Sequence, residues 1–145
     1  IKYIFVHCTA SRQTWSVDAL LKEFTNKGWH YPGYHWIVEA NGKATQLMTE
    51  DLPSNGVKGY NHESINVAYM GGISRSGNPI DNRTDEQKAT LRELLTELKQ
   101  RYPDAKILGH RDISPDLNHN GKVDIWERIK ECPCFDAITE YADIK

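Results

Sequence analysis

The first eight residues, IKYIFVHC, constrain the fold more than any other stretch of the chain. Side chains alternate between the two faces of a strand, so the odd-numbered residues of 3–7 share one face and the even-numbered residues of 4–8 share the other. Both faces are largely apolar. A strand that is apolar on both faces belongs in the interior of a sheet that is covered on both sides. Residues 1–8 therefore predict a buried central strand.

Two longer helices carry local start signals. Ser16 is an N-cap residue for a helix that ends near Gly28. Thr84 and Gln87 form a capping box ahead of a helix from about 85 to 102, whose leucines make one apolar stripe. Both segments are therefore predicted to pack one face against the sheet.

The remaining segments complete an alternating pattern. Residues 34–48, YHWIVEANGKATQLM, predict a β-hairpin. Asn41 and Gly42 are expected to supply the two positive-φ positions of its tight turn. Further elements are predicted as strands at 65–73 and 105–110 and as a helix at about 135–142. This order indicates an α/β fold with a mixed central β-sheet flanked by helices.

The length and charge of the chain limit its class. Its 145 residues fit a single domain, which we expect to span residues 1–145 as a monomer. The net charge of -2 offers no basic footprint for nucleic acid. No apolar run is long enough for membrane insertion, and no signal-peptide pattern is present. Three cysteines are an odd number, which predicts at least one free or metal-bound thiol.

Two histidines stand out by their position. His7 and His110 each end a strand that reads as central, at its carboxyl end. Open α/β sheets bind their ligands at that edge. The alternative is that each is a strand-end histidine hydrogen-bonded to the backbone, and position alone favours that alternative.

The cysteines after the last strand suggest a third ligand. The Cys132-x-Cys134 spacing is too tight for the usual paired zinc knuckle. One thiolate that faces His7 and His110 would give three ligands and an open fourth position, which is the layout of a catalytic zinc site. A closed structural site that uses both cysteines is the alternative. Cys8 points to the opposite face from His7 and is expected to be a core thiol.

Five short motifs occur in a characteristic order. They are FVHCTAS, GYHWIV, KGYNHESI, GHRD and KECPCFD. In this order they resemble the type 2 amidases, the zinc amidase family of phage lysozymes and peptidoglycan recognition proteins. The resemblance covers residues 3 to about 136. It implies an amidase and peptidoglycan recognition protein-like fold and the activity of an N-acetylmuramoyl-L-alanine amidase.

The resemblance also assigns roles to individual residues. It implies that zinc is held by His7, His110 and Cys132, with no ligand role for Cys134. The family's catalytic tyrosine matches Tyr34, and its catalytic lysine matches Lys130. Without the resemblance, Tyr34 reads as a strand-edge aromatic residue and Lys130 as a solvated charge.

Amide hydrolysis needs what these residues would supply. Zinc lowers the pKa of a bound water from ~15.7 toward ~7 and polarises the carbonyl oxygen. Lys130 as a cation and Tyr34 as a hydroxyl donor can stabilise the negative charge that collects on that oxygen. Either group could also pass a proton to the leaving amine, and the sequence does not decide between them. No glutamate base of the H-E-x-x-H kind is present.

One departure from the family lies just before KGYN. The family often has a small residue followed by histidine there, whereas this chain has Asn55-Gly56. A substrate contact at Gly56 is therefore not carried over. Asn61 and His62 are expected to line the substrate groove, and the alternative is that they only fold the loop through hydrogen bonds.

Residues 116–127, DLNHNGKVDIWE, match a twelve-residue calcium loop. The expected Ca²⁺ ligands are Asp116, Asn118, Asn120, Lys122, Asp124 and Glu127. Pro115 directly precedes the loop and forbids the entering helix of an EF-hand. The alternative is an Asx-rich turn that leads into a short helix at 125–130. If calcium binds, this insertion is expected to hold Lys130 and Cys132 near the zinc.

The leading functional hypothesis follows from the resemblance. It is a zinc-dependent hydrolase that cleaves the amide between N-acetylmuramic acid and the L-alanine of peptidoglycan. Spacing alone reaches only a mononuclear zinc hydrolase. The alternative is a non-catalytic peptidoglycan-binding module, which typically lacks the cysteine that Cys132 supplies here. Action on the cell wall implies a periplasmic, extracellular or phage-released enzyme, and the sequence does not choose among a phage lysin, a remodelling enzyme and an effector.

Overall fold

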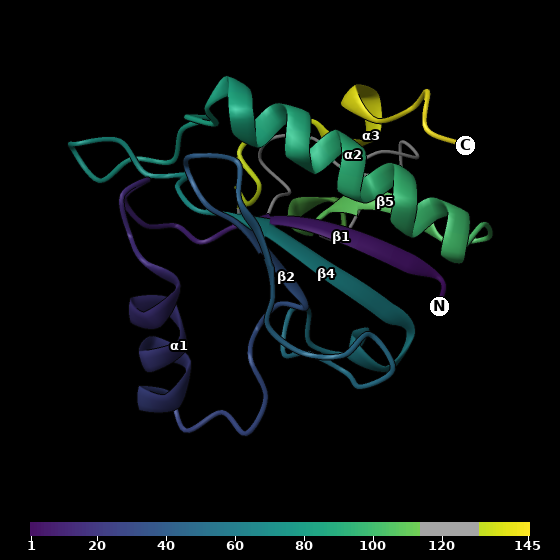
Figure 1. Cartoon of the computed structure of the whole chain (residues 1–145), viewed down its shortest axis with the longest axis horizontal. Helices are drawn as coiled ribbons and strands as arrows, with labels where there is room; N and C mark the ends of the chain where they lie inside the picture. Colours follow the sequence, from purple (N-terminus) through teal and green to yellow (C-terminus); the bar gives the residue numbers. More distant parts are fainter. Residues whose placement is uncertain (114–130) are drawn as a thin grey trace, which may run out of the picture.

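The computed structural model describes residues 1–113 and 131–145. Five strands form one sheet in the order β3-β2-β4-β1-β5 (Figure 1). Their bounds are β1 Tyr3–Cys8, β2 Trp36–Val38, β3 Ala44–Gln46, β4 Ser64–Tyr69 and β5 Lys106–Gly109. Only the β2–β3 pair is antiparallel, and the other neighbouring pairs in this sheet are parallel. The sheet is therefore mixed, as the alternating pattern predicts.

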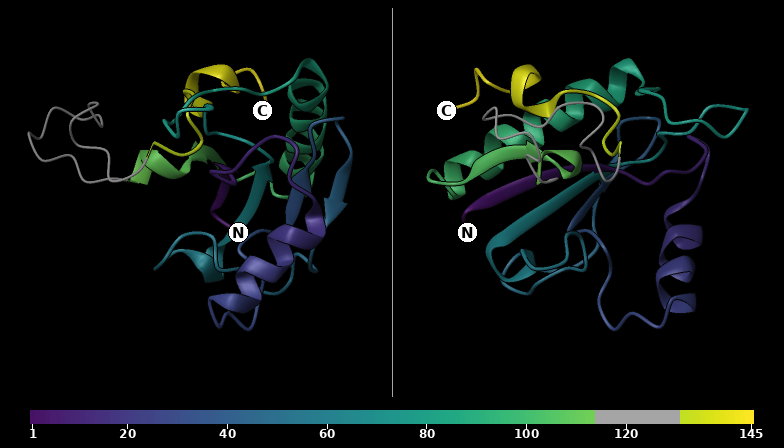
Figure 2. Two further views of the ribbon diagram at one scale, coloured as in Figure 1. Left: turned by 90° about the vertical axis from the view of Figure 1, so that its left-hand side faces the viewer. Right: turned by 180° about the vertical axis from the view of Figure 1, so that it is seen from behind.

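Helices cover both faces of this sheet. They are α1 Val17–Asn26, α2 Asp85–Arg101 and α3 Ala137–Glu140, with 3-10 turns η1 Asn61–Glu63 and η2 His110–Ile113. Helices α2 and α3 lie over one face, and α1 lies on the other side of the sheet (Figure 2). These layers confirm the α/β class. No helix in the described parts of the chain combines the length and apolarity needed to cross a membrane.

The predicted helix starts are confirmed. The Ser16 hydroxyl accepts a hydrogen bond from the Ala19 amide at 3.1 Å, and the Thr84 hydroxyl accepts one from the Gln87 amide at 3.1 Å. In return, the Thr84 amide donates a hydrogen bond to the Gln87 side-chain oxygen at 3.0 Å, which completes the capping box. These contacts satisfy amide groups that the first helical turn leaves without partners.

The hairpin forms, but its turn differs from the predicted one. Of the two turn residues, only Gly42 has a positive φ, at +86°, and Asn41 does not. The Gly42 amide donates to Glu39 O at 2.8 Å, and the Glu39 amide donates to Lys43 O at 2.9 Å. This is a three-residue connection that ends in one left-handed residue, and only that residue requires glycine.

The two faces of β1 are divided as predicted. Its even-numbered residues belong to the buried cluster beneath α2 and α3. On its odd-numbered face, the Tyr3 and Phe5 rings stack at 5.4 Å, and Phe5 and His7 lie 6.4 Å apart. A smaller cluster joins Leu20 and Phe24 of α1 to the sheet. The site histidine therefore faces away from the main core.

Strand β5 differs from its prediction in place and length. It lies at the edge of the sheet, not in a central position, and it ends at Gly109. His110 instead begins the turn η2. Because β5 pairs with β1, the edge position still brings His110 beside His7. Pairing partner, and not centrality, decides whether two strand ends meet.

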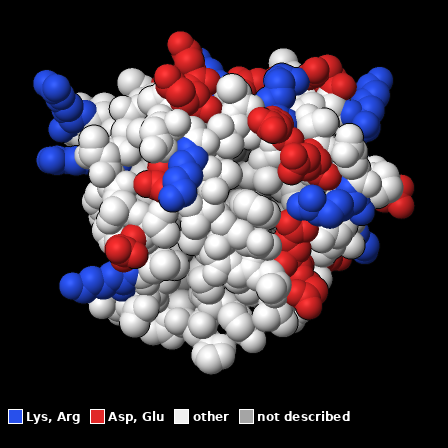
Figure 3. All heavy atoms as spheres, viewed as in Figure 1, with Lys and Arg blue, Asp and Glu red and all other residues white. Residues whose placement is uncertain are grey.

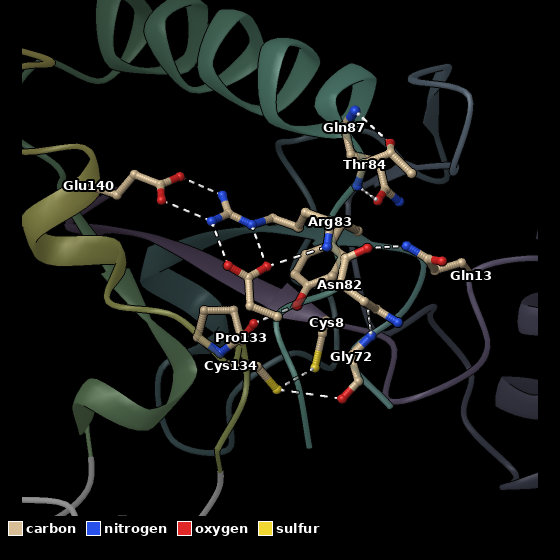
Figure 4. A network of polar contacts seen from close by, with 12 residues as sticks. Cys8, Gln13, Gly72, Asn82, Arg83, Thr84, Gln87, Pro133, Cys134 and Glu140 are labelled. Atoms are coloured by element: carbon tan, nitrogen blue, oxygen red, sulfur yellow. Dashed lines mark hydrogen bonds and ion pairs between the residues drawn. The ribbon is translucent and has the colours of Figure 1, made fainter. Parts of the chain in front are cut away.

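A buried arginine ties the C-terminal segment to the rest of the fold. Arg83 donates hydrogen bonds to Asp81, at 2.9 Å, and to Glu140, at 2.8 Å (Figure 4). Its guanidinium lies 3.4 Å from the centre of the Phe135 ring. The Tyr69 hydroxyl donates to Pro133 O at 2.6 Å. These contacts hold the segment that carries the last two cysteines against the core.

Candidate active site

Two histidines meet at the carboxyl ends of neighbouring parallel strands. Val6 of β1 pairs with Gly109 of β5. The residues that follow them, His7 and His110, therefore lie side by side. Their ring centres are 5.0 Å apart, with the planes at 74°. His7 is buried and His110 is half-buried. The open-sheet rule thus places both imidazoles at one edge.

Cys132 joins them from the C-terminal segment. Its Sγ lies 3.8 Å from His7 Nδ1 and accepts a hydrogen bond from the Cys8 amide at 3.2 Å. The Arg111 amide donates to Cys132 O at 2.8 Å and so holds the Cys132 backbone beside η2. The ligand atoms of His7, His110 and Cys132 all lie within 4.8 Å of one another. In the described ranges, this is the one group of histidine, cysteine and acidic residues arranged to hold a metal.

The donor set fits zinc. Two imidazole nitrogens and one thiolate are ligands that Zn²⁺ prefers. Tetrahedral coordination at usual bond lengths separates such ligand atoms by about 3.3–3.6 Å. The separations in the structure are at most 4.8 Å, which exceeds this range by up to about 1.5 Å, so side-chain rotations would close the three donors around an ion.

Cys134 is not part of this group. Its Sγ lies 3.9 Å from Cys8 Sγ and 3.6 Å from Gly72 O, among the core contacts drawn in Figure 4. Contact with Cys132 and burial raise the pKa of the Cys8 thiol to about 12, and contact with Cys8 and burial raise that of Cys134. Both therefore stay protonated thiols. This placement contradicts the closed site of four protein ligands.

Tyr34 stands over the same group. Its ring centre is 5.1 Å from that of His7, and its hydroxyl donates to Cys8 O at 3.3 Å. Burial raises the pKa of this phenol, so it keeps its proton. A cavity of about 190 Å³ opens here. Its lining comprises His7, Cys8, Thr9, Ala10, Phe24, Lys27, Trp29, Gly33, Tyr34, Asn55, Gly56, His110 and Cys132.

The other predicted site residues are placed differently. Asn61 and His62 are not among the residues that line the cavity. The Asn61 side chain accepts a hydrogen bond from the Val57 amide at 2.9 Å, and His62 is exposed on η1. Their substrate-binding role stays a prediction. Lys130 and the predicted calcium loop at 116–127 lie outside the described residues.

Sequence reasoning missed Asn66. This residue lies in the middle of β4, is fully buried, and its side-chain oxygen is 2.7 Å from His7 Nε2. A signal was present, because asparagine is depleted in strands and β4 is otherwise apolar at its centre. A buried amide needs hydrogen-bond partners, but the sequence does not say which.

Sequence comparison shows the family. A family profile described as N-acetylmuramoyl-L-alanine amidase matches residues 1–134. The endolysin of Klebsiella phage KP32 is 36% identical over 135 residues, which are 92% of this chain and 80% of that protein. The endolysin of Escherichia phage T7 is 33% identical over the same shares of both proteins.

Solved structures share the fold at lower identity. The Ph2119 endolysin of a Thermus scotoductus bacteriophage superposes with a TM-score of 0.73 at 21% identity, covering 97% of this chain and 82% of that one. The amidase LysC of Clostridium intestinale gives 0.75 at 19%, covering 98% and 83%. Drosophila PGRP-LB gives 0.68 at 16%, covering 97% and 78%. The chain therefore belongs to the N-acetylmuramoyl-L-alanine amidase family and is a peptidoglycan amidase that acts on the cell wall.

Proposed function

We propose that this amidase is zinc-dependent and that His7, His110 and Cys132 hold the ion. The observation that carries the proposal is the convergence of their three ligand atoms within 4.8 Å, on the wall of a cavity that also contains Tyr34. When bound there, Zn²⁺ supplies Lewis-acid polarisation of the scissile carbonyl and an activated water as nucleophile. His7, His110 and Cys132 would hold the ion, and a site with three protein donors would keep one coordination position for water or substrate.

The side chains around the cavity have separate tasks in this reaction. Tyr34 is a neutral hydroxyl donor, and its present bond to Cys8 O is long at 3.3 Å. A substrate oxygen that carries developing negative charge is a stronger acceptor than a peptide carbonyl, so the hydroxyl turns toward it. Lys130, as carried over from the family motif, adds a cation at the same oxygen. One of these two groups protonates the leaving amine.

The cavity is the place where the stem peptide enters. Asn55 and Gly56 contribute to its wall. We expect Asn61 and His62 to contact the substrate beyond the cavity. Charged side chains of both signs are interspersed around the molecular face drawn in Figure 3. We expect the enzyme to act as a monomer on the muramoyl–alanine amide. A non-catalytic binding module is disfavoured, because Cys132 meets both histidines.

The calcium loop is a second element of the proposal. We propose that the chain is a single amidase domain of residues 1–145 and that residues 116–127 bind Ca²⁺ through Asp116, Glu127 and the oxygen ligands between them. Glu127→Ala removes the bidentate ligand. Calcium is expected to raise the melting temperature of the parent protein but not of this variant. Equal melting temperatures with and without Ca²⁺ in the parent would remove the loop from the proposal.

Metal removal tests the zinc proposal directly. Purified protein is dialysed against EDTA, its zinc content is measured, and release of new alanine amino termini from cell walls is followed. We expect activity to fall with zinc content and to return on addition of Zn²⁺. Undiminished release from zinc-free protein contradicts the proposal. Wall binding without release, in protein loaded with zinc, favours the binding module.

A further inference from the structure

One side chain outside the ligand group is hydrogen-bonded to a member of that group. Asn66 is fully buried in β4, and its side-chain oxygen lies 2.7 Å from His7 Nε2. Its amide nitrogen donates to Ser54 Oγ at 2.8 Å and lies 3.5 Å from Ser64 Oγ. The amide thus has partners at both ends, which offsets the cost of burying it. Two hydroxyl acceptors on the nitrogen leave the oxygen to face His7.

This orientation selects one form of the imidazole. An oxygen acceptor beside Nε2 requires the proton of neutral His7 to be on Nε2. The lone pair is then on Nδ1, the ring nitrogen that lies 3.8 Å from Cys132 Sγ. Hydrogen bonds to the distal nitrogen of a metal-binding histidine fix both its tautomer and its ring orientation. The backbone of Asn66 is itself held, because its amide donates to His35 Nδ1 at 3.0 Å.

The Asn66 side-chain amide lies against Gly56, and its position depends on the absence of a side chain there. A Cβ at Gly56 would lie 2.2 Å from Asn66 Cγ and 2.3 Å from its Oδ1. Any side chain at position 56 would therefore displace the Asn66 amide. Gly56 also lines the cavity. The absence of a side chain at Gly56 and the position of the buried Asn66 amide therefore fit one another.

We propose that Asn66 is a positioning residue of this amidase, which holds His7 with its proton on Nε2 and its Nδ1 lone pair toward His110 and Cys132. Gly56 provides the space that this contact needs. The inference rests on the proposed metal site at His7, but the tautomer exists without metal and can be measured on the metal-free protein.

The test compares two substitutions of nearly equal size. Asn66→Asp keeps an acceptor oxygen and cannot donate unless protonated, whereas Asn66→Leu keeps the volume and removes the acceptor. Imidazole nitrogen NMR on metal-free protein reports the tautomer of His7, and competition with a chelator gives the zinc dissociation constant. We expect the parent and Asn66→Asp to show the Nε2–H form. Asn66→Leu should lose that preference and bind zinc about 10–100-fold more weakly.

Two further variants keep the test decisive. Ser54→Ala removes an acceptor of the Asn66 amide and leaves the His7 side chain unchanged. It replaces Asn66→Leu in the test if that variant does not fold. We expect it to lower the preference of His7 for the Nε2–H form, by less than Asn66→Leu would. Gly56→Ala should reproduce the spectral change of Asn66→Leu by displacing the amide. Circular dichroism and thermal melts identify the variants that fold.

Several outcomes would overturn the inference. One is a folded Asn66→Leu that retains the Nε2–H form and binds zinc as the parent does. Another is an Nδ1–H form in the parent that changes to Nε2–H in Asn66→Asp, since it shows that the amide nitrogen had faced His7. An unchanged spectrum in Gly56→Ala refutes the role of Gly56. If the parent has the predicted tautomer but binds no zinc, the proposed metal site fails while the assignment of Asn66 to His7 stands.

Discussion

The two faces of strand β1 have different roles, although the residues that face them are neighbours in the sequence. On one face, His7 meets a second imidazole, a thiol and an amide, and each contact is a hydrogen bond or a near-ligand distance. On the other face, Cys8 packs into the apolar cluster under α2 and α3. The same division separates Cys132, in the ligand group, from Cys134, two residues later, beside Cys8. Chemically identical thiols thus have different roles because they lie on opposite faces.

The comparison teaches that the core face sets the geometry of the site face. The segment with Cys132 is held from behind, by Tyr69 at Pro133 and by Arg83 at Phe135 and Glu140. Changes on the site face should therefore remove chemistry with little loss of stability. Changes on the core face should cost stability first.

The largest expected effect separates the two thiols. Cys132→Ser should lower kcat/KM by more than about 10³-fold, because the metal it helps to hold contributes several kcal/mol and each 1.36 kcal/mol is tenfold. Cys134→Ser is the matched control, with zinc content retained and kcat/KM within a few-fold of the parent. Steady-state kinetics and zinc analysis on both proteins check this. Loss of zinc in Cys134→Ser would break the distinction between the faces.

Next in size is the buried arginine behind the site. Arg83→Met leaves Asp81 and Glu140 without their cation and should lower the free energy of unfolding by about 3 kcal/mol, the lower end for a broken buried pair because both carboxylates are partly exposed. Lys2→Met, which removes the exposed pair with Glu63, should cost less than about 1 kcal/mol. Urea titrations measure both. Equal losses would show that Arg83 does not fasten the C-terminal segment.

The smallest effect is a pH dependence from His35. Burial lowers the pKa of this imidazole below the usual value of 6.5, and its Nδ1 accepts the Asn66 amide as a neutral base. Between the folded and unfolded pKa values, the unfolded chain binds more protons. The free energy of unfolding should therefore fall as the pH drops below about 6.5, with a slope of at most about 1.4 kcal/mol per pH unit from this one group.

Replacement of His35 isolates that contribution. The difference in unfolding free energy between the parent and His35→Gln should change with pH across this window. Melts from pH 5 to 8 provide the comparison. A constant difference for His35→Gln would show that this histidine is not held neutral by the fold.

Local signals predicted much of the fold. Ser16 and the Thr84–Gln87 box mark helix starts through contacts within three residues, so neighbouring residues suffice to specify them. The alternation in β1 is equally local. The prediction of a two-residue hairpin turn was wrong. The Asn41-Gly42 pair is compatible with more than one turn, and the pairing of Glu39 with Lys43 selects a three-residue connection. The edge position of β5 depends on sheet order, which no single segment encodes.

The sequence by itself determined the kind of site: two strand-end histidines, a nearby cysteine and a family pattern that implies amide hydrolysis. Residue spacing did not decide which thiol joins them: the family resemblance named Cys132, and the tertiary structure brings that thiol to the histidines, because residues 131–134 pack against the end of β1. Only the tertiary structure decided that Asn66 holds His7, a contact that spans 59 positions of the chain. Local propensity acts over a few residues, whereas ligand geometry is set by strand pairing and packing between distant segments.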